Sequence, residues 1–76
     1  MITVYSSSTC PACEGLKMKL RSWDIDFDVK SLDTDADAKQ ELLSNGFRTV
    51  PQLKVNGTFV KNIQTLTKAD IVQWLH

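Results

Sequence analysis

The chain has 76 residues, of which nine are basic and nine acidic, so its formal net charge at pH 7 is zero. This length allows one compact domain over residues 1–76, with a modest core. Because neither charge is in excess, we expect no nucleic-acid partner and no membrane surface. No segment approaches the length of a membrane span, and residues 1–7 lack the features of a signal peptide, so we expect a cytoplasmic monomer.

The first part of the chain predicts a strand, a helix and a second strand. Ile2–Tyr5 is β-branched and aromatic, which is typical of a strand. From Pro11 to Trp23 apolar residues recur at helical spacing, and proline suits the first turn of a helix. Asp24–Val29 alternates between acidic and apolar residues, which predicts a half-buried strand. Its inner face would carry Ile25, Phe27 and Val29.

A second helix is predicted over Asp35–Ser44. Carboxylates at its start suit the positive end of a helix, and Asn45-Gly46 is a typical stop. Its apolar stripe is short and consists of Ala38, Leu42 and Leu43.

The last part of the chain predicts a hairpin and a third helix. Two strand-like runs, Gln52–Val55 and Thr58–Lys61, are joined by Asn56-Gly57, a strong hairpin signal. The helix that follows would be capped at Thr65 or Thr67, and Asp70 is placed to complement Thr67.

The predicted order is therefore β-α-β-α-β-β-α. The first strand, helix and strand form a right-handed crossover with parallel strands, and the hairpin extends the same sheet in the antiparallel sense. The result is a four-stranded mixed sheet with helices on both faces. This is an α/β fold of the thioredoxin-like type at minimum length.

Both cysteines lie in the segment SSTCPACEG, residues 7–15. A structural disulfide is a poor explanation of Cys10 and Cys13, because cytoplasmic thiols are normally reduced and so short a loop gains little from closure. A zinc site needs four ligands, and beside these sulfurs the chain offers a single histidine, His76. A redox-active dithiol is the main interpretation, and an iron–sulfur cluster shared between two protomers is the alternative.

The helix that begins at Pro11 indicates different chemical roles for the two thiols. Its first turn presents unpaired N–H groups and the positive end of the helix dipole, which stabilise a thiolate at Cys10. Cys13 lies almost one turn later and faces the buried side. We therefore predict Cys10 as the nucleophile and Cys13 as the resolving thiol.

A second motif lies about forty residues further along the chain. CPAC after a first strand, together with TVPQL at Thr49–Leu53, resembles the glutaredoxin family over essentially the whole chain. The resemblance implies a dithiol–disulfide oxidoreductase, without a bound cofactor, that reduces protein disulfides or glutathione mixed disulfides. It also implies a cis peptide bond before Pro51, and backbone contacts from Val50 to the substrate thiol.

Other positions bear on the electron source. The segment NGFRTVP is similar to that of glutaredoxin-like redoxins that serve ribonucleotide reductase and commonly use thioredoxin reductase. The overall family pattern favours glutathione as the reducing co-substrate. Where glutathione-binding glutaredoxins usually carry a basic residue, paired glycines and an aspartate, this chain has Ser7, Lys61-Asn62 and Thr65.

The predicted substrate-binding residues come from several parts of the chain. They are Tyr5, Thr49, Val50, Pro51, Lys61, Asn62 and Thr65. Tyr5 has two interpretations, since it ends the first strand just before the cysteine loop and would either flank a groove or fill the core.

The acidic segment at Asp33–Asp37 imitates the start of a calcium loop. The glycine and the glutamate that such a loop needs are replaced by Ala38 and Ser44, so we predict no metal there. Acidic residues at the start of a helix explain the segment.

Overall fold

The structure is a computed structural model that describes residues 2–60 and 63–75. Its elements are β1 (Ile2–Ser6), α1 (Pro11–Ser22), β2 (Asp28–Ser31), α2 (Ala36–Ser44), β3 (Gln52–Val55), β4 (Thr58–Phe59), the short 3₁₀ helix η1 (Ile63–Thr65) and α3 (Lys68–Leu75). The predicted order of strands and α-helices is confirmed. The 3₁₀ turn before α3 was not predicted.

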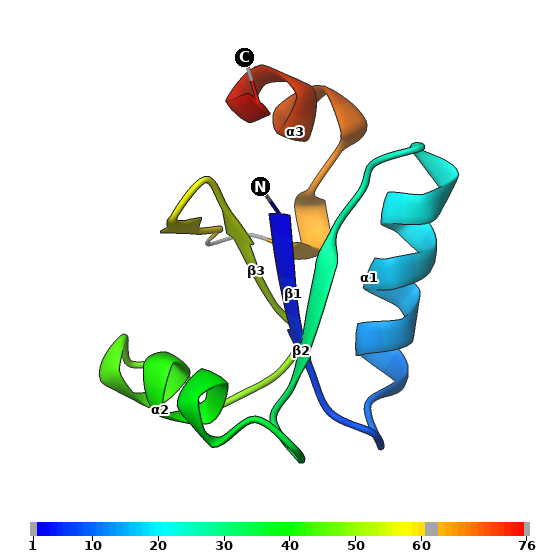
Figure 1. Cartoon of the computed structure of the whole chain (residues 1–76). Coiled ribbons are helices and arrows are strands. Elements are labelled where there is room, and N and C mark those ends of the chain that lie inside the picture. Colours follow the sequence, from blue (N-terminus) through cyan, green and yellow to red (C-terminus); the bar gives the residue numbers. More distant parts are fainter. Residues whose placement is uncertain (1, 61–62, 76) are drawn as a thin grey trace.

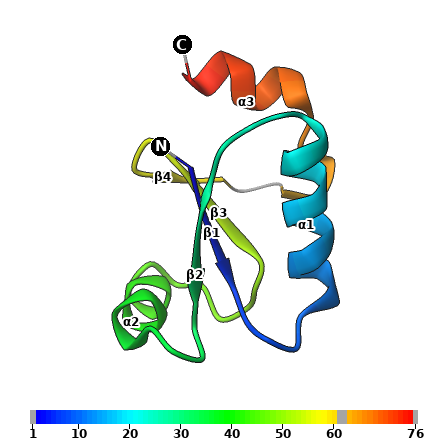
Figure 2. The same ribbon diagram turned by 45° about the vertical axis from the view of Figure 1, so that its right-hand side comes forward.

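The strands form one mixed sheet of four strands in the order β2-β1-β3-β4. β1 pairs parallel with β2 and antiparallel with β3, and β4 pairs antiparallel with β3. Helices α1 and α3 lie on one side of the sheet and α2 on the other (Figure 1), and the turned view shows the same separation (Figure 2). The predicted thioredoxin-like arrangement is therefore confirmed.

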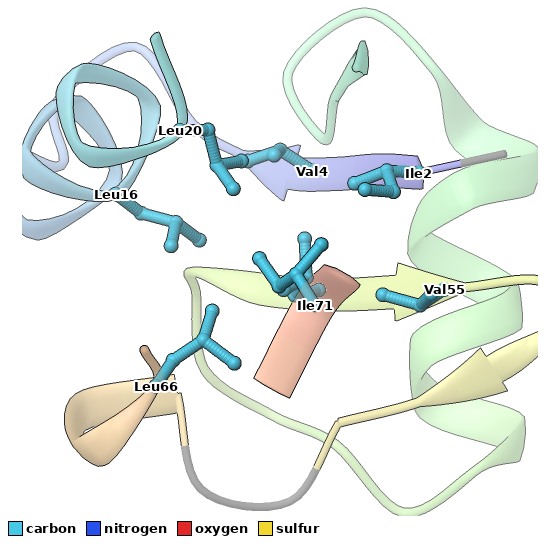
Figure 3. Close-up of a cluster of buried hydrophobic side chains, with 8 residues drawn as sticks. Ile2, Val4, Leu16, Leu20, Val55, Leu66 and Ile71 are labelled. Carbon is cyan, nitrogen blue, oxygen red and sulfur yellow. The ribbon is translucent and has the colours of Figure 1, made fainter. Parts of the chain in front are cut away.

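The main core lies between the sheet and the layer that contains α1 and α3. Side chains from β1 and β3 meet side chains from the helices there, and Figure 3 shows most of them. The cluster consists of Ile2, Val4, Leu16, Leu20, Leu53, Val55, Leu66 and Ile71. A smaller cluster under α2 contains Tyr5, Ala38 and Leu42. Strand alternation explains the division, because neighbouring residues of β1 point to opposite faces.

The start of β2 differs from the prediction, since the strand begins at Asp28 instead of Asp24. The reason is the way α1 ends. Asp24 has a positive φ of 59°, its N–H donates to the carbonyl of Arg21, and the N–H of Ile25 donates to the carbonyl of Leu20. Because of this Schellman motif, Asp24 and Ile25 form the C-terminal cap of α1 and do not belong to the strand that the alternating pattern predicted. Ile25 and Phe27 still pack against the main core.

Two apolar residues predicted to face the core are exposed. Val29 is 46% exposed because β2 is an edge strand and has a neighbouring strand on one flank only. Leu43 is 49% exposed, while Ala38 and Leu42, which are four residues apart, share the buried face of α2. Adjacent helical residues differ by about 100° in direction, so Leu43 turns away from the sheet.

The hairpin and the last helix follow the local signals. Asn56 and Gly57 both have positive φ, at 50° and 88°, as a tight hairpin turn requires. The Thr67 hydroxyl accepts from the Asp70 N–H at 3.3 Å, and the Asp70 carboxylate accepts from the Thr67 N–H at 3.1 Å, so Thr67 is the cap. β4 ends at Phe59, and the predicted end at Lys61 lies outside the described residues. No helix within the described parts is long and apolar enough to cross a membrane.

Candidate active site

Three loops meet at one end of the sheet (Figure 1). β1 and β2 are parallel and therefore end at the same edge, whereas the antiparallel β3 begins there. The Leu32 N–H donates to the Ser6 carbonyl at 2.8 Å and ties the loop after β2 to the end of β1. The cysteine loop and the segment before β3 consequently lie close together, although they are far apart in the sequence.

Cys10 lies where the loop after β1 becomes helix α1. It is the N-cap, Pro11 is the first helical residue, and the Cys13 N–H donates to the Cys10 sulfur at 3.1 Å. The Cys10 thiol in turn donates a long hydrogen bond to the Val50 carbonyl, with a sulfur-to-oxygen distance of 3.8 Å. A sulfur at this position replaces the usual oxygen of a helix cap and accepts an otherwise unpaired N–H of the first turn.

Cys13 has the opposite environment. Its side chain is fully buried, whereas Cys10 is half-buried, and both cysteines are free thiols. Burial, followed by the contact with Cys10, raises the pKa of the Cys13 thiol to about 11. The pair therefore combines one accessible sulfur with one shielded sulfur that stays protonated at neutral pH.

The loop before β3 presents backbone to the dithiol. Its Val50–Pro51 peptide bond is cis, Thr49 is exposed, and Val50 and Pro51 are half-buried. The Gln52 side chain is buried at the start of β3 and donates from Nε2 to the Thr49 carbonyl at 3.0 Å. The Gln52 side chain thus anchors the loop to the start of β3, a role that the sequence did not predict.

A groove of about 580 Å³ runs between α1 and this loop. Its α1 wall consists of Ala12, Gly15, Leu16 and Lys19, and the opposite wall of residues 49–52, Ile63 and Thr65. Cys10 adjoins the groove, because its sulfur lies 3.8 Å from the carbonyl oxygen of Val50, which lines the groove, and Ala12 follows two positions later in the sequence. The structure thus brings four of the predicted substrate-binding residues together there, namely Thr49, Val50, Pro51 and Thr65.

Comparison with known proteins agrees with this site. The family model described as glutaredoxin matches residues 2–60. The chain belongs to the glutaredoxin family. Membership implies thiol–disulfide oxidoreductase chemistry, for which a dithiol at a helix start is suited. No curated protein sequence shows a significant match to the chain.

Several solved structures share the glutaredoxin fold of this chain. The glutaredoxin-like protein NrdH-redoxin from Escherichia coli is 24% identical, with a TM-score of 0.77, and the match covers 99% of this chain and 93% of that one. The thioredoxin-like protein BC3987 is 23% identical, with a TM-score of 0.77 and coverages of 97% and 99%. A buckwheat glutaredoxin in complex with glutathione is 21% identical, with a TM-score of 0.78 and coverages of 97% and 74%.

Of the other predicted substrate-binding residues of this glutaredoxin, the structure describes Tyr5. Tyr5 is 1% exposed, belongs to the cluster under α2, and donates its hydroxyl proton to Glu41. It is not among the residues that line the groove, so the placement corresponds to the core interpretation of Tyr5, and its assignment to substrate binding stays a prediction. Lys61 and Asn62 lie outside the described residues.

The structure adds one residue to the glutaredoxin site that the sequence reasoning had missed. Asp33, in the loop after β2, accepts a hydrogen bond from the Ser8 N–H at 2.6 Å. Hydrogen bonding from Ser8, first from its side chain and then from its backbone N–H, lowers the pKa of Asp33. The sequence reasoning placed Asp33 in a helix-start cluster. The contact between Ser8 and Asp33 could have been predicted from the topology. The two residues follow β1 and β2, and loops that follow neighbouring parallel strands meet at one edge of the sheet.

A cavity of about 610 Å³ lies between the hairpin and α3, and its lining includes Phe59 and Trp74 but neither cysteine. Among the described residues, no group of three or more His, Cys, Asp or Glu side chains could hold a metal ion.

Proposed function

We propose that this protein is a glutaredoxin-type enzyme that reduces protein disulfides, with Cys10 as nucleophile and Cys13 as resolving thiol. The observation that carries the proposal is the contrast between the two sulfurs. Cys10 accepts the Cys13 N–H at the edge of a groove, while Cys13 is fully buried and its pKa is raised to about 11. Only the accessible sulfur is placed to meet a disulfide from outside.

In the first step, the Cys10 thiolate attacks one sulfur of the target disulfide. A bond forms between Cys10 and that sulfur, the target's own S–S bond breaks, and the departing thiolate takes a proton from solvent. The Val50 backbone, next to the Cys10 sulfur, is available to pair with the extended chain around the target cysteine. The Gln52 side chain, which donates to the Thr49 carbonyl, holds the loop that carries this backbone.

In the second step, Cys13 loses its proton and its sulfur attacks Cys10. The Cys10–Cys13 disulfide forms, the mixed disulfide breaks, and the second target thiolate leaves and is protonated. Two electrons have moved from the protein dithiol to the target disulfide. A high pKa keeps Cys13 from competing as the first nucleophile, because the thiolate is the reactive form.

For the electron source we propose glutathione, in keeping with the family and with the glutathione complex of the buckwheat neighbour. Two glutathione molecules would be oxidised to glutathione disulfide for each dithiol restored. A specific observation favours thioredoxin reductase as the second candidate. Among the described residues that line the groove there is no carboxylate to meet the γ-glutamyl ammonium, and Thr65 stands where the family usually has an aspartate.

For the target we propose a protein with a redox-active disulfide, and ribonucleotide reductase as a specific candidate. Support comes from the segment NGFRTVP and from the likeness to the glutaredoxin-like protein NrdH-redoxin, which is described as having a thioredoxin-like activity profile. The protein would then serve electron transport to that enzyme.

The test follows reduction of a disulfide-containing protein by wild type, Cys10→Ser and Cys13→Ser, recharged either by glutathione or by thioredoxin reductase with its nicotinamide cofactor. We expect the Cys10 variant to be inactive throughout, and the Cys13 variant to retain reaction with glutathionylated substrates only. Protein-disulfide reduction by the Cys10 variant would overturn the assignment of roles. The ratio of the two recharging rates in wild type identifies the electron source.

A further inference from the structure

The α1 wall of the groove carries one isolated positive charge. Lys19 is the only charged residue among the described residues that line the groove. The ion pairs found in the described part of the chain join Lys17 to Glu14 and Lys54 to Glu41, and none of them includes Lys19. The Lys19 ammonium lies 5.8 Å from the centre of the Trp23 ring, a contact that orients the cation and leaves its charge available.

Between the dithiol and Lys19 the same wall is open. A Cβ atom added at Gly15 would meet no other atom within 4 Å, so no packing inside the molecule accounts for the missing side chain. Glycine is among the least favourable residues inside a helix, and here it lies in the middle of α1. Together with Ala12, it leaves room for a chain to pass close to the helix.

The helix sets the distance between the dithiol and the charge. With a rise of 1.5 Å per residue, Cys10 and Lys19 are separated by roughly 13 Å along the α1 axis. The Lys19 ammonium packs against Trp23, which lies one turn further along α1, so the side chain does not shorten this separation. An extended chain advances about 3.3 Å per residue, so a peptide joined to Cys10 would reach Lys19 about four or five residues from its reacting cysteine.

We propose that the α1 wall of the groove is a specificity subsite for an acidic side chain of a protein substrate, about four or five residues from the reacting cysteine and paired with Lys19. This inference rests on the proposed disulfide reductase function and names the class of segment that it prefers. The occupant is an extended, acidic, cysteine-containing peptide, which the charge of Lys19 complements and the open wall at Gly15 admits.

The test uses peptide disulfides in which one glutamate is moved through about seven positions on either side of the cysteine. A peptide with glutamine at the same position is the reference. The readout is the ratio of kcat/KM for the Glu peptide to kcat/KM for the Gln peptide. Because each variant is compared with itself, this ratio separates charge recognition from general activity.

For wild type we expect a ratio of about three to ten at about four or five residues on one side, and near one elsewhere. Lys19→Gln should bring the ratio to about one, and Lys19→Glu below one. Lys39→Gln, the same charge change at an exposed position of α2, should keep the wild-type ratio. High salt should reduce the ratio in wild type.

Gly15→Leu tests the path of the chain. Leucine is a good helix former, and a Cβ atom at this site meets no neighbouring atom within 4 Å, so the variant should fold. It should lower kcat/KM for the acidic peptide severalfold more than kcat/KM for the small disulfide of 2-hydroxyethanethiol. An equal loss of kcat/KM for both substrates would contradict the proposal that the peptide passes over Gly15.

Two outcomes separate this inference from the function on which it rests. If wild type reduces Glu and Gln peptides equally at every position, or if Lys39→Gln changes the ratio as much as Lys19→Gln, the subsite is overturned while the reductase function stands. If wild type reduces neither the peptides nor the small disulfide, the function itself fails, and the subsite with it.

Discussion

The backbone N–H of Cys13 donates a hydrogen bond to the sulfur of Cys10 over 3.1 Å. This single contact caps helix α1 and also places a hydrogen-bond donor on the reacting sulfur. The helix start and the nucleophile are therefore one structural unit. Serine is the suitable replacement when Cys10 is tested, since its oxygen can still cap the helix while the sulfur chemistry is lost.

The two thiols should differ strongly in their reaction with an alkylating agent. At pH 7 we expect iodoacetamide to modify Cys10 at least tenfold faster than Cys13, because Cys13 is fully buried and protonated. Mass spectrometry of digested, time-quenched samples measures both rates. In guanidinium chloride the difference should disappear, and equal rates in the folded protein would contradict the proposed roles.

Stability should fall at alkaline pH. The pKa of Cys13 is raised from its ordinary value of 9.0 to about 11 in the fold, so the folded state favours the neutral thiol. The stabilising contribution is complete below pH 9 and is lost as the pH rises through 11. Urea unfolding at several pH values should show this decline in the free energy of unfolding.

Cys13→Ala provides the control for that titration. The decline between pH 9 and 11 should become smaller in this variant, since the buried thiol is gone. A residual decline is expected from Tyr5, whose pKa is also raised, first by burial and then by its hydrogen bond to Glu41. An unchanged decline would assign the alkaline loss to other groups.

Removing the Asp33 carboxylate should loosen the cysteine loop. Asp33→Ala leaves the Ser8 N–H without its 2.6 Å partner, and we expect the rate of protein-disulfide reduction to fall on the order of threefold. Hydrogen exchange at the Ser8 amide should become faster in the same variant. Asp33→Asn retains an acceptor oxygen and should lie between Asp33→Ala and wild type. Unchanged exchange in Asp33→Ala would contradict a positioning role.

Glu41 should matter for stability more than for chemistry. Its carboxylate accepts from the Tyr5 hydroxyl and pairs with the Lys54 ammonium, so it joins α2 to β1 and β3. Glu41→Gln should lower the free energy of unfolding by about 1–2 kcal/mol, measured by urea denaturation. Glu14→Gln, which breaks an exposed pair with Lys17, should cost much less. Equal costs would show that partial burial of the Glu41 pair adds nothing.

Local signals predicted most of the fold. Proline at the start of α1, Asn56-Gly57 in the hairpin and the Thr67–Asp70 capping pair each determine structure within a few residues, and the structure contains all three. The start of β2 was predicted too early because the end of α1 uses Asp24 in a left-handed conformation. Glycine usually marks a left-handed residue at a helix end, so an aspartate at this position did not predict the conformation.

The sequence by itself determined the dithiol, its place at a helix start and the order of the elements, because these depend on neighbours along the chain. Only the tertiary structure decided which distant groups meet the dithiol. The Val50 carbonyl reaches Cys10 from 40 positions away, Asp33 holds Ser8, and Tyr5 turns to the face under α2. Strand pairing and the side chosen by each helix set those contacts, and both result from packing of the whole core.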